Sequence, residues 1–410
     1  MVNRQGWVVV VASFGLLVAG RLLGVPEMFL LGTAGLVLVA VCLLIVARTH
    51  PNLSVQRVLH PPRVHVGMPS RVELSVRNDT TRRTAVVRLH DPVSDTAGAE
   101  LLLGPLDPGR QLAAAYQLPT DRRGIIQAGP LRAVVSDPFG LAERSFPVAG
   151  VAELTVLPRV DQLNPLPHSV GRDDPHAGAD HPNVLGQAGE DFYSLREYVV
   201  GDDLRRVHWA STARRGELMV RQDEVPWQGR ATVLLDARRD TTSPESFELA
   251  VSAAASIIMA SSRQRDLARL VITDGTDSGY VEGHSQVDQI MEQLAVVRRS
   301  RTVDLRPMLN LLKRAPGGGL VAILASPTGD DIDALVKLRG RFGVVTIVVF
   351  ERSSWTSSSG APDSRTRLAT PSARNVRVLR ITAEHPFASV WNEAILRPAT
   401  SRAQRGGPST

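Results

Sequence analysis

Leu320–Ala325 reads LVAILA and Val344–Phe350 reads VVTIVVF, two almost continuous apolar runs separated by a polar stretch. Runs of this kind are typical of strands that are buried on both faces, as in parallel sheets covered by helices. Further strands are predicted at Ala231–Leu235, Arg269–Thr273 and Val376–Ile381. Residues 228–397 therefore predict an α/β domain with a mostly parallel sheet.

Helices are predicted between these strands at Phe247–Ser262, Ser285–Val297, Val303–Arg314, Asp331–Arg341 and Pro386–Leu396. Ligands of such folds bind at the carboxyl ends of strands, where Asp236 ends the first one. Two glycine-containing stretches receive structural interpretations. Asp274–Gly279 predicts a hairpin turn before Tyr280. Gly317–Gly319 precedes its strand, whereas a phosphate-binding loop follows one, so it is interpreted as a flexible linker.

Two apolar runs open the chain, Trp7–Leu23 and Met28–Ala47, with a proline-containing turn between them. Each approaches the ~20 residues that a helix needs to cross a hydrocarbon layer of ~30 Å. Residues 1–50 therefore predict a transmembrane helical hairpin. A cleaved signal peptide is the alternative for the first run, although no small-residue cleavage site follows it.

The basic residues around the two runs predict the orientation of the hairpin. Arg4 precedes the first run, and the second is followed by Arg48, Arg57, Arg63 and Arg71. Since cytoplasmic flanks carry the excess of Lys and Arg, both ends of the hairpin are expected in the cytoplasm. We therefore expect a multi-pass protein of the plasma membrane with cytoplasmic domains after residue 50.

Residues 51–160 show a period of two, which predicts a small all-β sandwich. Val72, Leu74 and Val76 share one face of a strand. A second core face is predicted from Leu112, Ala114, Tyr116 and Leu118. The stretch Asp137-Pro138-Phe139-Gly140 predicts a tight turn in which Phe139 fills the core.

Residues 189–221 read GEDFYSLREYVVGDDLRRVHWASTARRGELMVR. The order of acidic-Phe, Leu-Arg-x-Tyr, Gly-Asp, Arg, His-Trp, Ala-Arg and Leu-Met-Val-Arg steps resembles the signature of the domain-of-unknown-function 58 (DUF58) family of membrane proteins. Ala210 departs from it, because a cation is expected after the tryptophan. The signature residues singled out as a docking surface are Asp191, Arg196, Tyr198, Gly201, Asp202, Arg205, His208, Trp209, Arg214 and Arg221.

The signature also has a physical interpretation. Asp203 is expected to cap a helix from Leu204 to about Arg214, which Gly216 ends. His208 and Trp209 are expected to pack between the two domains or to dock a partner. The alternative is that His208 acts as a general acid or base. No nucleophile elbow, HExxH motif or phosphate loop accompanies it, so we assign no catalytic residue and regard an enzyme as the less favoured reading.

The α/β domain resembles a von Willebrand factor A domain, whose metal site uses Asp-x-Ser-x-Ser, a threonine and a further aspartate. Here Asp236 and Thr302 correspond to two of these positions, but arginine and aspartate replace the serines at 238 and 240. An arginine among the ligands opposes a bound dication. We therefore expect a degenerate site with no metal and no cofactor.

Composition restricts the remaining possibilities. The 410 residues carry a net charge of +6, and the basic residues are scattered rather than clustered, which does not favour nucleic acid. The single Cys42 excludes an intrachain disulfide.

The expected order of domains is a hairpin at 1–50 (helices about 7–23 and 28–47), a β-sandwich at 51–160, a linker with the signature at 161–227, the α/β domain at 228–397 and a disordered tail at 398–410.

The resemblance implies a bacterial, membrane-anchored, non-catalytic interaction or scaffold protein. It further implies partners of two kinds, a MoxR-type AAA+ ATPase and a transglutaminase-like membrane protein, beside the lipid bilayer itself. A membrane-associated hydrolase that uses the His208 region is the alternative.

Overall fold

The computed structural model describes residues 1–49, 52–167, 194–199, 204, 207–222, 229–301, 304–350 and 375–396. The predicted tail at 398–410 lies outside them. The chain forms two compact units, one made of residues 1–159 with 291–297, and the other of residues 160–290 with 298–410. Each unit is described by itself below.

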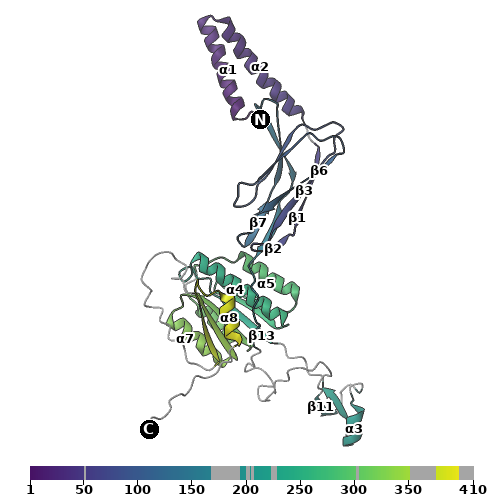
Figure 1. Cartoon of the computed structure of the whole chain (residues 1–410), viewed down its shortest axis with the longest axis vertical. Coiled ribbons are helices and arrows are strands. Elements are labelled where there is room, and N and C mark those ends of the chain that lie inside the picture. Colours follow the sequence, from purple (N-terminus) through teal and green to yellow (C-terminus); the bar gives the residue numbers. More distant parts are fainter. Residues whose placement is uncertain are drawn as a thin grey trace. The chain divides into compact units, whose positions relative to one another are not determined.

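The first unit begins with two antiparallel helices, α1 (Arg4–Leu23) and α2 (Pro26–Arg48), which lie side by side (Figure 1). Asn3 caps α1 by accepting a hydrogen bond from the Gly6 N–H, and Gly24 ends it with a φ of +69°. Both helices are long and apolar enough to cross a membrane. They contain the two apolar runs that predicted them.

Glycine and serine let the two helices approach closely. A Cβ atom on Gly32 would lie 2.6 Å from the Ser13 carbonyl oxygen, and one on Gly20 would lie 2.6 Å from the Phe29 nitrogen. Small residues at a helix interface increase van der Waals contact between backbones, which is the main attraction available to helices in lipid. The hairpin is therefore built as a packed pair.

Three short sheets follow. Their orders are β1-β3-β6, β2-β10-β7 and β5-β4-β8-β9. The strands are β1 (Leu53–His60), β2 (Arg63–His65), β3 (Ser70–Asn78), β4 (Val87–Asp91), β5 (Ala99–Leu103), β6 (Gln111–Leu118), β7 (Gly124–Ala128), β8 (Leu131–Ser136), β9 (Glu143–Ala149) and β10 (Ala152–Leu157). Their inward residues form one apolar core that includes Val72, Leu74 and Val76, as the alternation predicted.

Two expectations for this region are wrong. Leu112 is exposed rather than in the core, because it lies near the start of the edge strand β6. Phe139 is 63% exposed, because its turn projects from the end of β8 instead of folding over the core. Tyr116 is half-buried and donates a hydrogen bond to buried Asp91 at 2.6 Å.

The second unit contains a five-stranded parallel sheet in the order β14-β13-β15-β16-β17. Its strands are β13 (Arg230–Leu235), β14 (Leu267–Ile272), β15 (Gly319–Ala325), β16 (Val344–Phe350) and β17 (Val376–Ile381). All seven residues of β15 are buried. Since successive side chains point to opposite faces, both faces of this strand are covered. The parallel sheet predicted from the apolar runs is confirmed.

Helices connect these strands at the predicted places: α4 (Pro244–Arg263), α5 (His284–Val296), α6 (Arg306–Lys313), α7 (Gly329–Lys337) with the 3-10 turn η2 (Leu338–Gly340), and α8 (Phe387–Leu396). Helices α6 and α7 pack their leucines against β15 and β16 in one core cluster. Asp274–Gly279 forms the predicted turn, which lays Asp277 and Val281 against β14.

Gly317–Gly319 is not the flexible linker that was expected. Gly318 is buried with a φ of +134°, and a Cβ atom there would lie 2.5 Å from the Arg230 carbonyl oxygen. The glycines therefore allow β15 to start in close contact with β13.

The start of the predicted linker lies against the α/β domain. The Trp391 indole donates a hydrogen bond to the Asn164 carbonyl at 2.8 Å, and the Asn164 N–H donates to the Asn392 side chain at 2.6 Å. Trp391 itself is 1% exposed. Helix α8 therefore fixes the chain at residue 164 to the same unit as the sheet.

Candidate functional site

The parallel sheet has one place where ligands of such folds usually bind. In the order β14-β13-β15-β16-β17, the chain leaves β13 toward β14 on one side and leaves the adjacent strand β15 toward β16 on the other. The crevice at the carboxyl ends of β13 and β15 is the topological switch point. Asp236 follows β13 there, and Thr328 and Asp331 follow β15 at the start of α7.

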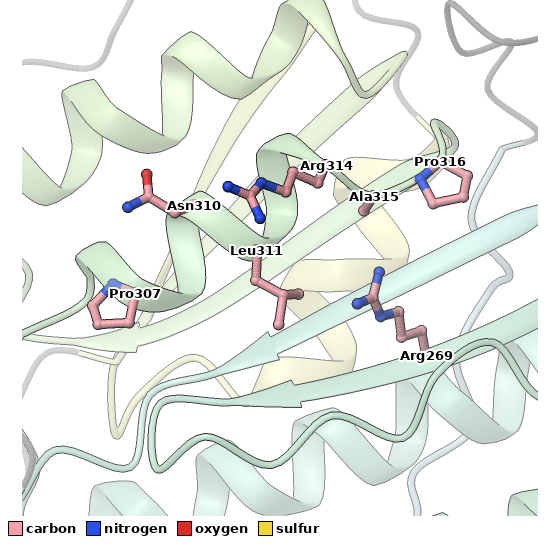
Figure 2. A pocket seen from close by; sticks show the side chains of 7 residues that line it. All are labelled: Arg269, Pro307, Asn310, Leu311, Arg314, Ala315 and Pro316. Atoms are coloured by element: carbon pink, nitrogen blue, oxygen red, sulfur yellow. The ribbon is translucent and has the colours of Figure 1, made fainter.

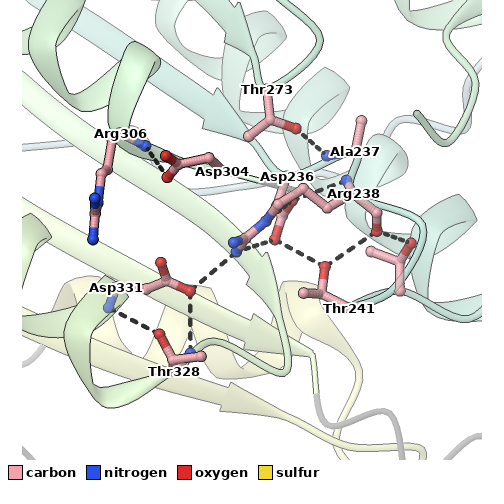
Figure 3. Close-up of polar contacts among 10 residues, drawn as sticks. Asp236, Ala237, Arg238, Thr241, Thr273, Asp304, Arg306, Thr328 and Asp331 are labelled. Carbon is pink, nitrogen blue, oxygen red and sulfur yellow. Dashed lines mark hydrogen bonds and ion pairs between the residues drawn. The ribbon is translucent and has the colours of Figure 1, made fainter. Parts of the chain in front are cut away.

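An arginine of the same chain lies between the two carboxylates of this crevice (Figure 3). Arg238 Nε and Nη2 donate to the two carboxylate oxygens of Asp236 at 2.9 Å each, and Nη2 also donates to Asp331 Oδ2 at 3.1 Å. Thr241 donates a further hydrogen bond to Asp236 Oδ2 at 3.1 Å. The guanidinium therefore stands where a ligand cation would meet the two carboxylates.

Burial and charge act in opposite directions on Arg238, which is 5% exposed. Burial opposes the charged form, but the Asp236 and Asp331 carboxylates outweigh it and raise the pKa of Arg238 above its ordinary value. Asp331 also accepts from the Thr328 N–H as part of the α7 capping box. The ion pair therefore joins the end of β13 to the start of α7.

The expected remnant of a metal site is thus present only in part. Asp236 lies at the crevice as predicted, while Thr302 falls outside the described residues. Within the described ranges, no group of three or more His, Cys, Asp or Glu side chains could hold a metal ion. Sequence reasoning missed Asp331, although its position three residues after Thr328 is a capping-box signal.

A pocket of 480 Å³ lies beside helix α6 (Figure 2). Its lining residues are Arg269, Pro307, Asn310, Leu311, Arg314, Ala315 and Pro316. Arg269 is held by two hydrogen bonds to Asp277, at 2.8 and 2.6 Å, so its charge is already compensated. None of the seven lining residues is a carboxylate, a histidine or a nucleophile. This pocket therefore offers no acid–base chemistry of its own.

The signature region forms a small module of two strands and a helix. Strand β11 (Ser194–Glu197) pairs antiparallel with β12 (Met219–Gln222), and helix α3 (Trp209–Arg215) lies between them in the chain. Val207, Met219 and Val220 are buried. The Met219 N–H donates to Thr212 Oγ1 at 3.0 Å, which attaches the helix to the strand.

His208 has a structural role at the start of α3. Its Nδ1 accepts a hydrogen bond from the Ser211 N–H at 3.3 Å and lies 2.9 Å from Ser211 Oγ. His208 is therefore the N-cap, and the helix begins at Trp209 rather than at Leu204. The predicted end is confirmed, since Gly216 adopts a φ of +78°.

The Trp209 side chain is 68% exposed, and the expectation that it packs between the two domains stays a prediction. Arg214 and Arg215, in the last turn of α3, are also exposed, and so is Leu218 before β12. The module therefore presents an aromatic ring and two cations to the outside, which is the composition of binding hot spots.

The other signature residues are distributed as follows. Asp191, Gly201, Asp202 and Arg205 lie outside the described residues, as does Asp203. Arg196 and Arg221 belong to β11 and β12, where Arg196 pairs with Val220 and Leu195 with Arg221. The Tyr198 N–H donates to the Leu218 carbonyl at 2.8 Å. The structure therefore joins Arg196, Tyr198, His208, Trp209, Arg214 and Arg221 in one module.

Two solved structures with some likeness to this chain are distant. One is the CARDB domain of a Pyrococcus furiosus protein in complex with di-metal ions, with 16% identity, coverage of 26% of this chain and 93% of that chain, and a TM-score of 0.21. Another is the Pseudomonas fluorescens alkylpurine DNA glycosylase AlkC, with 10% identity, coverage of 29% and 34%, and a TM-score of 0.20. Scores this low support no statement about fold or function.

No curated protein matches the chain. A family model does match it: residues 194–355 fit the family described as protein of unknown function DUF58. The matched range begins at β11 and ends just after β16, so it includes the signature module and most of the parallel sheet. Residues 194–355 therefore match the DUF58 family model, in agreement with the resemblance of the signature motifs.

Proposed function

We propose that this protein is a non-catalytic interaction or scaffold protein, anchored in the plasma membrane by its helical hairpin. Its signature module docks a MoxR-type AAA+ ATPase, and a transglutaminase-like membrane protein is a further partner. The flanking arginines favour a cytoplasmic location for all residues after 50. The α/β domain is of the von Willebrand factor A-like kind, with Arg238 in place of a metal ion.

The observation that carries this proposal is the exposure of Trp209 at the start of α3. A tryptophan that is 68% exposed, on the same short helix as exposed Arg214 and Arg215, contributes little to the core of its own domain. Tryptophan and arginine are the residues that contribute most often to binding energy in protein interfaces. The two guanidinium groups fit a partner with an acidic surface.

The crevice and the pocket of the α/β domain support a non-catalytic role. The two carboxylates at the switch point already bind Arg238, and the pocket beside α6 is lined by no carboxylate, histidine or nucleophile. The ion pair closes the place where this fold class usually holds a ligand.

The alternative is a membrane-associated hydrolase that uses the His208 region. A general base needs a substrate proton within reach and is normally oriented by a third group. In the described part of the chain, the recorded partners of the His208 ring are the Ser211 N–H and hydroxyl, which cap the helix. This arrangement favours the capping role over catalysis.

Photo-crosslinking from position 209 tests the proposal. The full chain, with benzoylphenylalanine in place of Trp209, is expressed in its own host and irradiated, and crosslinked proteins are identified by mass spectrometry. We expect an AAA+ ATPase of the MoxR type. The matched control carries the same probe at Leu249, which is 37% exposed on α4 and far from the module in sequence.

A crosslink to the ATPase from position 209 that is absent from position 249 supports docking through the module. No crosslinked ATPase from position 209, with the protein correctly inserted in the membrane, contradicts it. A crosslink from both positions to the same degree shows contact without a role for the signature.

A further inference from the structure

A rigid turn connects β8 to β9 in the first unit. The Asp137 carboxylate accepts hydrogen bonds from the N–H groups of Phe139 at 2.8 Å and Ala142 at 2.5 Å. The Gly140 N–H donates to the Asp137 carbonyl at 3.1 Å, and Gly140 has a φ of +66°. These bonds fix the turn from the inside. Phe139 is left at its tip with 63% of its surface exposed.

The turn sits against the ends of the two apolar helices. The Asn3 side chain, which caps α1, donates to the Gly140 carbonyl at 2.6 Å, and the Asn3 N–H donates to the Leu141 carbonyl at 3.1 Å. Gly6 leaves no side chain in the way, since a Cβ atom there would meet the Leu141 carbonyl oxygen. One apolar cluster joins Leu141 and Ala142 to Val39, Cys42 and Val46 of α2.

These contacts set the depth of the turn relative to a bilayer. The apolar stretch Met28–Ala47 has the length of ~30 Å that fills a hydrocarbon layer. Cys42, which packs against the turn, lies five residues before Ala47, roughly 7–8 Å inside the end of that stretch at the helical rise per residue. A hairpin that spans the bilayer therefore brings the turn to the membrane interface.

Arginines lie at the ends of the helices and of the strand that adjoin the turn. Arg144, which follows the turn, donates to the Ala47 carbonyl at 3.4 Å, and its guanidinium lies 4.9 Å from the centre of the Phe146 ring. Arg4 and Arg48, at the adjoining helix ends, are exposed. An exposed aromatic ring together with exposed arginines is typical of interfacial membrane anchors.

We propose that the turn 137–141 is a third membrane contact of this protein, in which Phe139 inserts into the bilayer interface and Arg4, Arg48 and Arg144 bind lipid phosphates. This inference rests on the proposed anchoring by the hairpin. The contact fixes the β-region at the membrane surface, because the turn is rigid and is bonded to both β8 and β9. The occupant of the exposed ring is lipid rather than a protein partner.

Site-specific fluorescence in liposomes tests the contact. The full chain contains one cysteine, so Cys42→Ser, or Cys42→Ala if the serine variant does not fold, gives a background for single-cysteine labelling. An environment-sensitive probe is placed at Phe139→Cys. The matched control is Val151→Cys, 54% exposed just beyond the other end of β9, and the reference for hydrocarbon is Leu31→Cys, 60% exposed on α2.

Liposomes contain phosphatidylglycerol and a lipid with a nitroxide near the headgroup end of its acyl chain, and iodide is the aqueous quencher. The expected result is strong quenching by the nitroxide lipid at positions 139 and 31, with quenching by iodide confined to position 151.

Equal quenching by iodide at positions 139 and 151, while position 31 is quenched by lipid, overturns the inference and leaves the anchoring intact. Absence of lipid quenching at 31 overturns the anchoring as well. Protection at 139 that depends on protein concentration and not on lipid assigns the ring to a second copy, and also overturns the inference.

Discussion

The carboxyl edge of the parallel sheet and the signature module differ in the exposure of their charged and aromatic side chains. At the sheet edge, Arg238 is 5% exposed, and its guanidinium is bonded to two carboxylates. In the module, Trp209 is 68% exposed and shares the helix α3 with two exposed arginines. The fold class favours a ligand at the first place, whereas the exposed aromatic and cationic side chains are at the second. The place where a fold usually binds ligands is therefore a weaker indicator of a binding site than the exposure and bonding of the side chains found there.

The largest effect is expected from Asp236→Ala. This change leaves the buried guanidinium of Arg238 with only Asp331, and breaking a buried ion pair typically lowers the free energy of unfolding by about 3–5 kcal/mol. Urea denaturation of the full chain in detergent, followed by circular dichroism, measures it. The control is Asp333→Ala, an exposed carboxylate on α7, which should change the free energy by less than about 0.5 kcal/mol.

The double variant Asp236→Ala/Arg238→Met should recover much of the lost stability, because the uncompensated charge is removed together with its partner. A single Asp236→Ala protein that is as stable as the wild type would show that the sheet edge is not closed by this ion pair.

A smaller effect is expected from Asp277→Asn at the pocket. The hydrogen bonds from Arg269 lower the pKa of Asp277 below its ordinary value of 3.8. The pair therefore contributes stability that is fully present above the unfolded pKa and is lost as pH falls through the lower folded pKa. At pH 7 the variant should lose about 1.5–3 kcal/mol, the usual size of a hydrogen bond to a charged group. Thermal melting from pH 7 down to strong acid checks this, and a gap that does not narrow in acid contradicts it.

Metal addition should produce only a small shift, and only where Arg238 is absent. Millimolar Mg²⁺ is expected to leave the melting temperature of the wild type unchanged, because the guanidinium opposes a dication next to Asp236. In Arg238→Ser, the carboxylates of Asp236 and Asp331 become available together with the hydroxyls of Thr241 and the introduced serine. Mg²⁺ should therefore raise the melting temperature of this variant. A Mg²⁺ effect in the wild type that disappears in Asp236→Ala would show an ordinary metal site.

The smallest effect on stability is expected from Trp209→Ala. Since the indole is mostly exposed, its removal should change the free energy of unfolding by no more than about 0.5 kcal/mol, the usual range for surface substitutions. The same substitution at buried Trp391 is the comparison, where about 3–5 kcal/mol is expected. A large loss of unfolding free energy in Trp209→Ala would show that the indole is packed in a core.

The sequence was most informative where apolar periodicity is strong. The apolar side chains of the runs at 320–325 and 344–350 require burial on both faces of a strand. The parallel sheet and its helices could therefore be predicted with small errors at their ends. Phe139 and Leu112 were placed wrongly because periodicity cannot tell a turn or an edge strand from the core. Their exposure is decided by tertiary packing.

The candidate sites could be predicted only in part. Asp236 was found because it ends a buried strand. The bonds of Arg238 to Asp236 and to Asp331 join residues that are 2 and 93 positions apart, and they depend on the geometry of the crevice. His208 was misread because histidine is a rare N-cap, while serine, threonine, aspartate and asparagine dominate. The local sequence offered Asp203 as the better cap.

The most direct test of the central claim compares Trp209→Ala with His208→Gln in the rescue of a deletion strain. Each variant is also melted and tested for recovery of the MoxR-type ATPase. The account predicts a folded Trp209→Ala protein that fails to rescue and does not retain the ATPase, and a His208→Gln protein that loses at most about 2 kcal/mol from its helix cap and still rescues. A stable His208→Gln protein that fails to rescue, beside a functional Trp209→Ala protein, would contradict docking through the module and favour a hydrolase.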